Sequence, residues 1–509
     1  MEVIWIGLQD FALKFLEFSA LIFAFVVGLV VLAVIYMYIA DVTQTSHTIR
    51  RNYPVIGRFR YFFEHLGEFF RQYFFAQDRE ELPFNRAQRA WVYRAAKNID
   101  STVAFGSTHA LNQPGDFIFL NGLFPPLEEE VQPRGTISFG EGVARQPYHT
   151  TSFFNISAMS FGALSAPAIQ ALSRGAHQAG IWLNTGEGAI SPFHLEGGCD
   201  IIFQIGTAKY GVRDEDGHLS DDKLRQIAAH EQVRMFEIKL SQGAKPGKGG
   251  ILPGAKVTEV IASTRGIPPG QDSLSPNRHT DVNSIDDLLD MIHRVREVTG
   301  KPTGIKAVIG QSAWLEKLCQ RVQERGLQYA PDFFTVDSAD GGTGAAPQSL
   351  MDYMGLPLRS SLPLVVDKLS EYGLRERVRV ICSGKMINPG GVAAALCLGA
   401  DCVNSARGFM FALGCVQALQ CNKNTCPTGI TTHDEDLQEG LNPHDKAKRV
   451  ACYAKNLMHE VETIAHSCGV AEPRMLNRSH AQVINELGIP ESMLERYPEV
   501  QSLPEYQRG

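Results

Sequence analysis

The sequence reads FFTVDSADGGTG at residues 333–344, LPLVVDKLSEY at residues 362–372 and VRVICSGK at residues 378–385. Two short apolar runs of the β type therefore flank a segment with helical periodicity. The first run ends in a glycine-rich loop and the second in Ser-Gly-Lys. Strands that are joined through a helix are parallel neighbours. This part of the chain predicts a parallel sheet with polar residues at the ends of its strands.

The same alternation continues outward in both directions, from about residue 150 to about residue 410. Helical patterns follow most of the β-type runs, such as Ala166–Gln178 and Ile285–Val298. An α/β fold with eight such units predicts a (β/α)8 TIM barrel, which typically has about 250 residues. A doubly wound open sheet is the alternative, but no G-x-G-x-x-G motif supports a dinucleotide-binding version of it. We expect strands near residues 153–158, 182–185, 200–205, 236–240, 303–308, 333–337, 378–382 and 401–405.

The residues at the predicted strand ends have a common character: they are small, polar or cationic. In a barrel these ends form the active-site rim. Lysines that end apolar strands, together with glycine-rich loops, favour an anionic ligand, and a phosphate-bearing cofactor is the simplest interpretation. The segments are Ser157-Ala158-Met159-Ser160, residues 184–188, Gln204, Lys239, Lys306, residues 337–344 with Asp340, Gly341 and Gly342, Ser383-Gly384-Lys385, and Ser405-Ala406-Arg407-Gly408.

Three cysteines lie close together in GCVQALQCNKNTCPTG, with the spacing C-x5-C-x4-C at Cys415, Cys421 and Cys426. Clustered thiolates followed by a proline are typical of iron–sulfur ligation. Zinc is the alternative, because His433 is available to complete a Cys3His site. The other seven cysteines have no ligand spacing, and we expect them in the core.

The N-terminal part carries 23 residues without a charge, FSALIFAFVVGLVVLAVIYMYIA, at residues 18–40. A helix of this length covers about 34 Å, enough to cross the hydrocarbon core of a bilayer. We favour an uncleaved, single-pass membrane anchor over a signal peptide or a buried helix, because the charged residues before the run are mainly acidic: Glu2, Asp10 and Glu17 against Lys14. Four arginines follow at residues 50, 51, 58 and 60, so the positive-inside rule places residues 1–17 outside and the catalytic part in the cytoplasm. The aromatic segment after them predicts an amphipathic helix, either on the lipid surface or packed on the next domain.

The overall composition excludes several classes of protein. The 509 residues include 48 basic and 55 acidic side chains, a formal charge of −7 that argues against nucleic-acid binding. Apolar residues make up 44%, as in globular proteins, and ten cysteines are too sparse for a disulfide scaffold. The predicted organisation is an extracytoplasmic end (1–17), a span (18–40), a juxtamembrane helical linker (41–149), a cofactor-binding barrel (150–410), a cysteine segment (411–435) and a helical extension (436–509).

Several long motifs in residues 150–435 resemble the FMN-binding synthase domain of glutamate synthase. They occur in the family's order, and the leader resembles its short membrane-anchored branch. The resemblance implies an oxidoreductase acting on CH–NH2 donors, with FMN at the barrel mouth and a [3Fe-4S] cluster beside it. The motifs are SAMSFGALS, NTGEG, IKLSQGAKPGKGG, LPGAKV, SPNRHTDVNSIDDL, DGGTGA and GC-x5-C-x4-CPTGI.

The resemblance also implies roles for individual residues. Reduction of 2-iminoglutarate, formed from 2-oxoglutarate and ammonia, would give L-glutamate by hydride transfer from the flavin. The family's cluster ligands match the three clustered cysteines, and its flavin contacts match the strand-end segments around Ala158 and Met159, Gln204, Lys239, Lys306, Lys385 and Arg407. Gln242, Lys245 and Arg265 match its oxo-acid contacts, which suits a dicarboxylate. Glu187 matches an acidic residue with a proton-transfer or gating role, and Lys239 and Lys245 complete the catalytic set.

Departures from the family pattern leave the substrate open. Ile251 stands where the family has a glutamine, Lys248 where it has an acidic residue, and Ala189-Ile190 where it has glycine and glutamate. No cysteine precedes Cys199, so we expect ammonia to come from solution or a partner, and electrons from a ferredoxin or a reductase. The alternatives are a membrane-linked FMN oxidoreductase for another amino or keto acid, and a non-catalytic redox-sensing relative.

Overall fold

The computed structural model describes residues 2–500, apart from the side chains of residues 2–5, 8, 9, 68 and 69. The chain divides into two compact units, residues 1–87 and 88–509, which we describe separately. The part of the predicted C-terminal extension at residues 501–509 lies outside the described residues.

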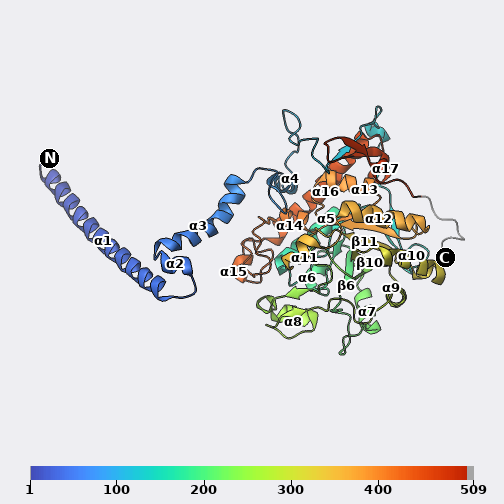
Figure 1. The fold of residues 1–509 in the computed structure, drawn as a ribbon, viewed down its shortest axis with the longest axis horizontal. Helices are drawn as coiled ribbons and strands as arrows, with labels where there is room; N and C mark the ends of the chain where they lie inside the picture. The colour runs from blue at the N-terminus through green and yellow to red at the C-terminus, as the bar shows by residue number, and fades with distance from the viewer. Residues whose placement is uncertain (1, 501–509) are drawn as a thin grey trace. The chain divides into compact units, whose positions relative to one another are not determined.

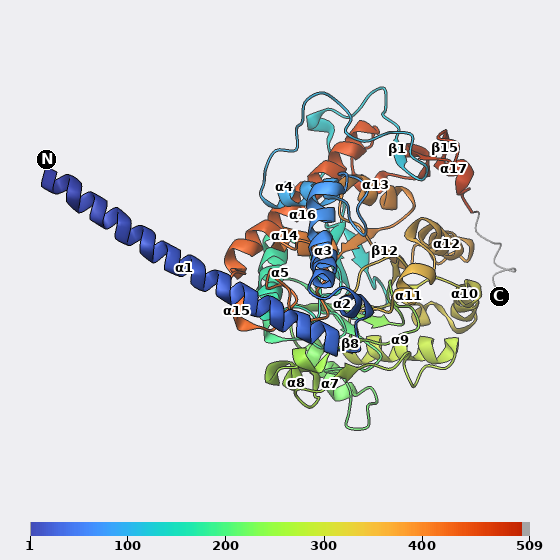
Figure 2. The same cartoon turned by 60° about the vertical axis from the view of Figure 1, so that its left-hand side comes forward.

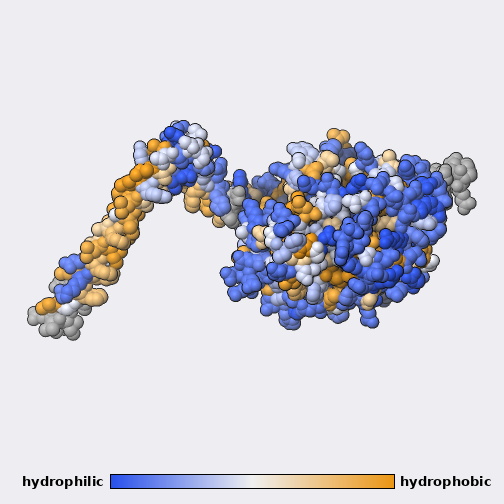
Figure 3. Space-filling view, turned by 90° about the horizontal axis from the view of Figure 1, so that it is seen from below, coloured by the Kyte–Doolittle hydropathy of each residue, from blue (hydrophilic) through white to orange (hydrophobic). Residues whose placement is uncertain are grey.

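The first unit is helical: α1 (Glu2–Thr43), α2 (Thr48–Asn52), α3 (Ile56–Phe70) and the π-helical turn η1 (Arg71–Phe75). Residues Asp10–Thr43 of α1 are long and apolar enough to cross a membrane, and their most apolar window is fully exposed. Figure 3 shows this apolar surface along the helix. The predicted amphipathic helix is α3, which exposes Phe59, Phe62 and Phe63.

A buried carboxylate joins the helices of the first unit. Asp41, near the end of α1, accepts hydrogen bonds from Arg50 Nε (2.9 Å), Arg58 Nε (2.8 Å) and the amide of Val55 (3.0 Å). Val55 has a left-handed φ of 65°, which turns the chain into α3. Two of the predicted juxtamembrane arginines thus hold the bend that follows the apolar helix.

The second unit is built on a closed barrel of eight parallel strands, as the sequence predicts (Figures 1 and 2). All eight predicted strands are present, within three residues of their expected ends, and none belongs to an open sheet. Around the barrel they follow the order β4-β5-β6-β7-β10-β11-β12-β13. Their bounds are β4 (Phe154–Ile156), β5 (Leu183–Asn184), β6 (Ile201–Ile205), β7 (Val233–Lys239), β10 (Thr303–Val308), β11 (Phe333–Asp337), β12 (Arg379–Ser383) and β13 (Cys402–Ser405).

Helices follow the strands and cover the barrel. Side-chain caps define where several begin: Ser165 accepts from the Ala168 amide, and Ser284 from the Asp287 amide. One helix begins at Leu358, four residues before the predicted start at residue 362, because its polar first turn lacks apolar periodicity. The helices are α5 (Ala166–Ala179), α6 (Pro192–Leu195), α7 (Asp221–Ala228), α8 (Glu259–Arg265), α9 (Ile285–Thr299), α10 (Ala313–Arg325), α11 (Gln348–Tyr353), α12 (Leu358–Glu371), α13 (Pro389–Cys397) and α14 (Arg407–Leu413).

A hairpin of β2 (Ile137–Phe139) and β3 (Tyr148–Thr150) closes the amino-terminal end of the barrel. Phe139 is fully buried and contacts Trp182 and Phe333 edge to face, with ring centroids 5.9 and 5.8 Å apart. Burying aromatic side chains of this size stabilises the fold by about 1.5–3 kcal/mol each. The site must therefore lie at the opposite, carboxyl end.

The C-terminal extension departs in part from the predicted helical extension. Its main element is α16 (Pro443–Ser467), which packs closely on α5, and a Cβ at Gly175 would lie 2.5 Å from Val450. The extension also contains β14 (Ala481–Ile484) and β15 (Pro490–Ser492), which form a sheet with β1 (Phe117–Phe119). These strands are too short for a pattern in the sequence, and pairing between distant segments creates them. The remaining short helices are α4 (Arg86–Ala96), α15 (Glu435–Gln438) and α17 (Met493–Arg496).

Candidate active site

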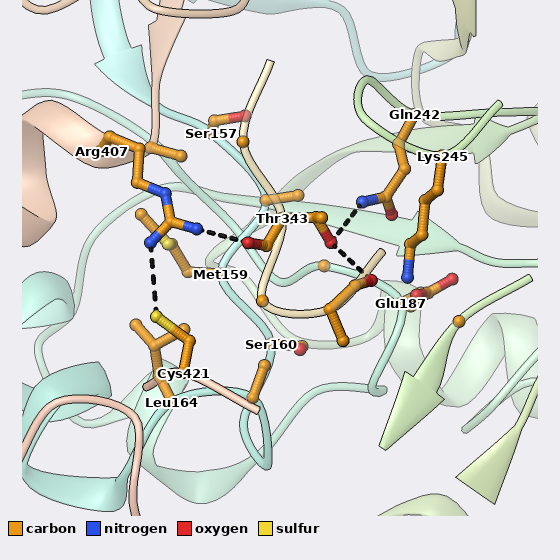
Figure 4. Close-up of a pocket in the computed structure, with 18 of the residues that line it drawn as sticks. Ser157, Met159, Ser160, Leu164, Glu187, Gln242, Lys245, Thr343, Arg407 and Cys421 are labelled. Carbon is orange, nitrogen blue, oxygen red and sulfur yellow. Dashed lines mark hydrogen bonds between the residues drawn. The ribbon is translucent and has the colours of Figure 1, made fainter. Parts of the chain in front are cut away.

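A cavity opens at the carboxyl ends of the barrel strands, lined by the strand ends and by the loops after them. It collects most of the residues that the sequence predicts for cofactor and substrate, and Figure 4 shows part of its lining. The cysteine loop and the β8–β9 hairpin (Ile251–Leu252, Ser273–Leu274) close its sides. The predicted residues that line it are Ala158, Met159, Ser160, Glu187, Gln204, Lys239, Gln242, Lys245, Arg265, Lys306, Gly342, Ser383, Gly384, Lys385, Ser405, Ala406, Arg407 and Cys421.

Glu187 and Lys239 form an ion pair at the centre of this cavity. The Lys239 ammonium lies 2.9 Å from Glu187 Oε2 and also donates to Gln242 Oε1. Gln242 in turn donates to Thr343 Oγ1 at 3.1 Å (Figure 4). Barrel closure thus joins the ends of β5 and β7 with the glycine-rich loop after β11.

Two glycines make room for the Glu187 carboxylate. A Cβ at Gly250 would lie 2.3 Å from Glu187 Oε1, and one at Gly206 would lie 2.6 Å from the Glu187 Cβ. Burial alone would raise the pKa of Glu187, but the charges of Lys239 and Lys245 outweigh burial and lower it. The carboxylate is therefore ionised at neutral pH and offers a negative charge to a ligand.

Two further cations converge on the same end of the cavity. Lys245 is buried, and burial lowers the pKa of its ammonium to about 8 although Glu187 acts in the opposite direction. Arg265 is buried on α8, donates to Ser273 Oγ (3.2 Å) and to the Phe161 carbonyl (3.1 Å), and leaves Nε without a partner in the described residues. Burial lowers the pKa of the Arg265 guanidinium as well. An anionic ligand would find three cations here: Lys239, Lys245 and Arg265.

A second polar network lies deeper, inside the barrel. Lys306 pairs with Asp337 at 3.3 Å, and although burial opposes its charge, Asp337 and Glu237 raise the pKa of the lysine. Glu237 is fully buried and accepts from Asn184 (2.8 Å), Gln204 (2.7 Å) and Thr335 (2.6 Å). These bonds hold Gln204 at the cavity floor.

The other end of the cavity fits a phosphate group. Ser405, Ala406 and Arg407 line it at the start of α14, whose first turn has no side-chain cap, so its backbone N–H groups are available. Lys385, in the neighbouring turn, pairs with Asp340 at 3.1 Å. This combination of backbone donors and cations matches the predicted phosphate-bearing cofactor.

The three clustered cysteines lie in an irregular loop after α14. Three residues of this loop have left-handed φ angles: Gln417, Leu419 and Asn424. All three thiols are free, and each has a hydrogen-bonding neighbour: the Gln417 amide lies 3.4 Å from Cys415 Sγ, Thr428 Oγ1 3.3 Å from Cys426 Sγ, and Arg407 Nη1 3.8 Å from Cys421 Sγ. Tyr93 of α4 donates to the Cys415 carbonyl at 2.6 Å and holds the loop from outside.

Three free thiols with hydrogen-bonding neighbours fit a thiolate-bound cluster. His433, the fourth ligand of the zinc alternative, is engaged elsewhere, with Nε2 2.8 Å from the Gly162 carbonyl. N–H and O–H donors around thiolates are a common feature of iron–sulfur sites.

Four predicted residues lie outside the cavity lining. Cys415 and Cys426 belong to the cysteine loop, while Asp340 and Gly341 shape the loop after β11, where the Gly341 amide donates to the Ser338 carbonyl at 2.9 Å. Two residues that contribute to the site were not predicted: Glu237 and Lys256. A carboxylate inside the apolar run VRMFEIK is a signal for Glu237, but nothing in the local sequence points to Lys256.

Comparison with known proteins assigns the family. The conserved region in glutamate synthase matches residues 130–471, two thirds of the chain. The chain belongs to the glutamate synthase family. The glutamate synthase large subunit-like protein YerD of Bacillus subtilis is 38% identical over 506 residues, covering 91% of this chain and 96% of YerD.

One further relative and one solved structure are also similar to this chain. The archaeal-type glutamate synthase [NADPH] of Thermotoga maritima is 34% identical over 371 residues, covering 72% of this chain and 69% of that protein. The crystal structure of mandelate oxidase with (S)-4-hydroxymandelic acid matches with a TM-score of 0.47 and 14% identity, over 78% of this chain and 99% of that chain. The family match and the two relatives confirm, at the level of the glutamate synthase family, the resemblance that the motifs predict.

Proposed function

We propose that this member of the glutamate synthase family is an FMN- and [3Fe-4S]-dependent oxidoreductase that reduces 2-iminoglutarate, formed from 2-oxoglutarate and ammonia, to L-glutamate. The observation that carries the proposal is the convergence of Lys239, Lys245 and Arg265 around the Glu187 carboxylate at the carboxyl end of the barrel. Three cationic side chains suit a substrate with two carboxylates, and the Glu187 carboxylate suits the cationic imino nitrogen of that substrate.

The residues that would hold the cofactors are distributed along the cavity. The phosphate of FMN would bind at the uncapped start of α14 and the turn at Ser383-Gly384-Lys385, with Gln204, Lys239 and Lys306 toward the ring. The cluster would bind Cys415, Cys421 and Cys426. When bound, the flavin supplies hydride transfer and the cluster supplies single-electron transfer.

The chain's own residues bind and orient the substrate. Lys245 and Arg265 would pair with the two carboxylates, and Gln242 would donate a hydrogen bond beside them. Glu187, ionised and held by Lys239, would accept a hydrogen bond from the imino nitrogen and keep it protonated. Although burial lowers its pKa to about 8, Lys245 is mainly charged at neutral pH and so would pair with a carboxylate.

The N-terminal helix supports a membrane location. Residues Asp10–Thr43 meet the length and composition of a single span. The arginine-rich bend after it supports a cytoplasmic catalytic part. There the protein would receive electrons from a ferredoxin or a reductase, and ammonia from solution or a partner. Resistance of the full-length protein to carbonate extraction, with residue 1 retained on N-terminal sequencing, is the expected result, and release or cleavage would exclude an anchor.

An anaerobic half-reaction tests the catalytic proposal. The purified full-length protein, loaded with flavin and iron, is reduced and mixed with 2-oxoglutarate and ammonium. We expect the oxidised flavin spectrum to return only when both are added, with one glutamate formed per flavin, and Lys245→Met to slow this return. No reoxidation from protein with full flavin and iron would exclude glutamate synthesis.

A second candidate is the same reduction, or the reverse oxidation, with another amino or keto acid. The observation that favours it is Ile251, which lines the cavity beside Gly250 and offers no hydrogen bond to a polar substrate. A screen of amino and keto acids in the same spectral assay distinguishes the two. A substrate with an apolar side chain that outperforms 2-oxoglutarate would favour this second candidate.

A further inference from the structure

A buried lysine lies between the cavity and the cysteine loop. Lys256 ends the short helix η3 (Gly254–Lys256), which follows the β8 strand, and its side chain is 2% exposed. Its ammonium donates to the carbonyls of Ala163 (2.9 Å) and Cys421 (3.3 Å). These carbonyls satisfy two of its three N–H donors but leave its charge uncompensated.

No carboxylate of the described residues forms an ion pair with Lys256. Every other lysine that lines the cavity, except Lys245, has an acidic partner: Glu187 for Lys239, Asp337 for Lys306 and Asp340 for Lys385. A buried ammonium without a counter-charge is costly, so an anion is required nearby. The acidic groups that interact with it are the thiols of Cys421 and Cys426.

A second cation approaches the same cysteine by a different route. Arg407 Nη1 lies 3.8 Å from Cys421 Sγ, and its other terminal nitrogen donates to the Thr343 carbonyl (Figure 4). Lys256 reaches the backbone of Cys421, and Arg407 reaches its sulfur. Cys421, the one cysteine of the three that lines the cavity, therefore lies between two cations.

From this geometry we infer that Lys256 is the counter-cation of the proposed iron–sulfur cluster and raises its reduction potential. This inference rests on the proposed function, because it requires a cluster on the three thiolates. Thiolate-ligated clusters carry net negative charge, and one-electron reduction adds to it. A fixed positive charge beside Cys421 stabilises the reduced state more than the oxidised state. The lysine thereby makes the cluster a better electron acceptor.

The test compares three full-length proteins: wild type, Lys256→Met, which keeps the length of the side chain but not its charge, and Lys256→Arg, which keeps the charge. The oxidised cluster is followed by EPR during a redox titration, with iron per chain measured in parallel. In Lys256→Met we expect the equilibrium constant for one-electron reduction to fall at least about tenfold, a drop of about 59 mV. Lys256→Arg should restore most of the wild-type potential. Loss of iron in Lys256→Met but not in Lys256→Arg would also support the charge role.

Three results would overturn the inference. The first is a wild-type potential in iron-loaded Lys256→Met. The second is equal loss of iron from both variants, which would make Lys256 a packing residue. The third is an unchanged potential with weaker binding of 2-oxoglutarate, which would make it a substrate ligand. Wild-type protein without iron would instead refute the cluster itself, and the iron measurement separates that failure from the other three.

Discussion

Lys245 makes binding of an anionic substrate depend on pH in a way that the structure specifies. Its ammonium is buried, and burial lowers its pKa to about 8. An anion bound beside it favours the charged form, so the pKa rises in the complex. Affinity is therefore at its maximum below pH 8 and is lost as the pH rises through that value. If only the protonated form binds, the Kd at pH 9 is about tenfold higher than at pH 7, a loss of about 1.4 kcal/mol.

Calorimetric titration of the full-length protein with 2-oxoglutarate between pH 6.5 and 9.5 measures this effect. The Kd should begin to rise near pH 8, and we call this point the break. Two variants should move the break in opposite directions. Glu187→Gln removes a charge that raises the pKa of Lys245, so the break should move below pH 8. Lys248→Gln removes an exposed charge that lowers it, so the break should move above pH 8. Lys245→Met should abolish the break and weaken binding at every pH.

Two results would refute this reasoning. A wild-type Kd that stays constant from pH 7 to pH 9.5 would show that Lys245 does not bind the anion. A break that persists in Lys245→Met would assign the titration to another group. Proton uptake on binding, measured in buffers of different ionisation enthalpy, should rise from near zero at pH 7 toward one at pH 9, which checks the same sign independently.

Three other predictions concern the substrate, the fold and the cluster. Ile251→Gln should bind 2-oxoglutarate about fivefold more tightly, because one added hydrogen bond contributes about 1 kcal/mol; an unchanged Kd would show that this position does not limit binding. The buried Arg296 guanidinium lies 2.7 Å from the Asp332 carboxylate. Asp332→Asn removes this counter-charge and should lower the free energy of unfolding, measured by urea titration, by about 3–5 kcal/mol. A loss below about 1 kcal/mol would contradict the importance of this pair. Cys421→Ser should lose most bound iron while Cys452→Ser keeps it, and equal iron in both would exclude Cys421 as a ligand.

The barrel strands were predictable because parallel strands are buried on both faces. Each reads as a short apolar run, as in Ile201–Ile205, where all five residues are buried. The β2–β3 hairpin and the sheet of β1, β14 and β15 were not predicted, because strands of three or four residues contain too few side chains to show a period. The partner of β1 also lies far along the chain, as the pairing of Phe117 with Val483 shows. Such strands form only where the rest of the fold brings an edge to them.

The residues of the candidate site also divide into those that the sequence predicts and those that it does not. Residues at strand ends were predicted because every parallel strand of a barrel ends on the same side. Glu237 was missed because a carboxylate in an apolar strand has no obvious partner until Asn184, Gln204 and Thr335 arrive from three other strands. Lys256 was missed because its significance depends on the absence of a carboxylate near it, a fact of packing and not of sequence.

The sequence by itself determined the number and order of the strand–helix units, the apolar N-terminal helix and the spacing of the three thiols. These are local properties, since periodicity, hydropathy and spacing act over a few residues. Only the tertiary structure decided which charges meet. Glu187 lies 2.9 Å from Lys239, and Arg407 and Lys256 reach Cys421 from two different helices, because closure of the barrel brings together residues that are distant along the chain. The physical reason is that electrostatic interactions depend on distance and burial, which exist only once the chain has folded.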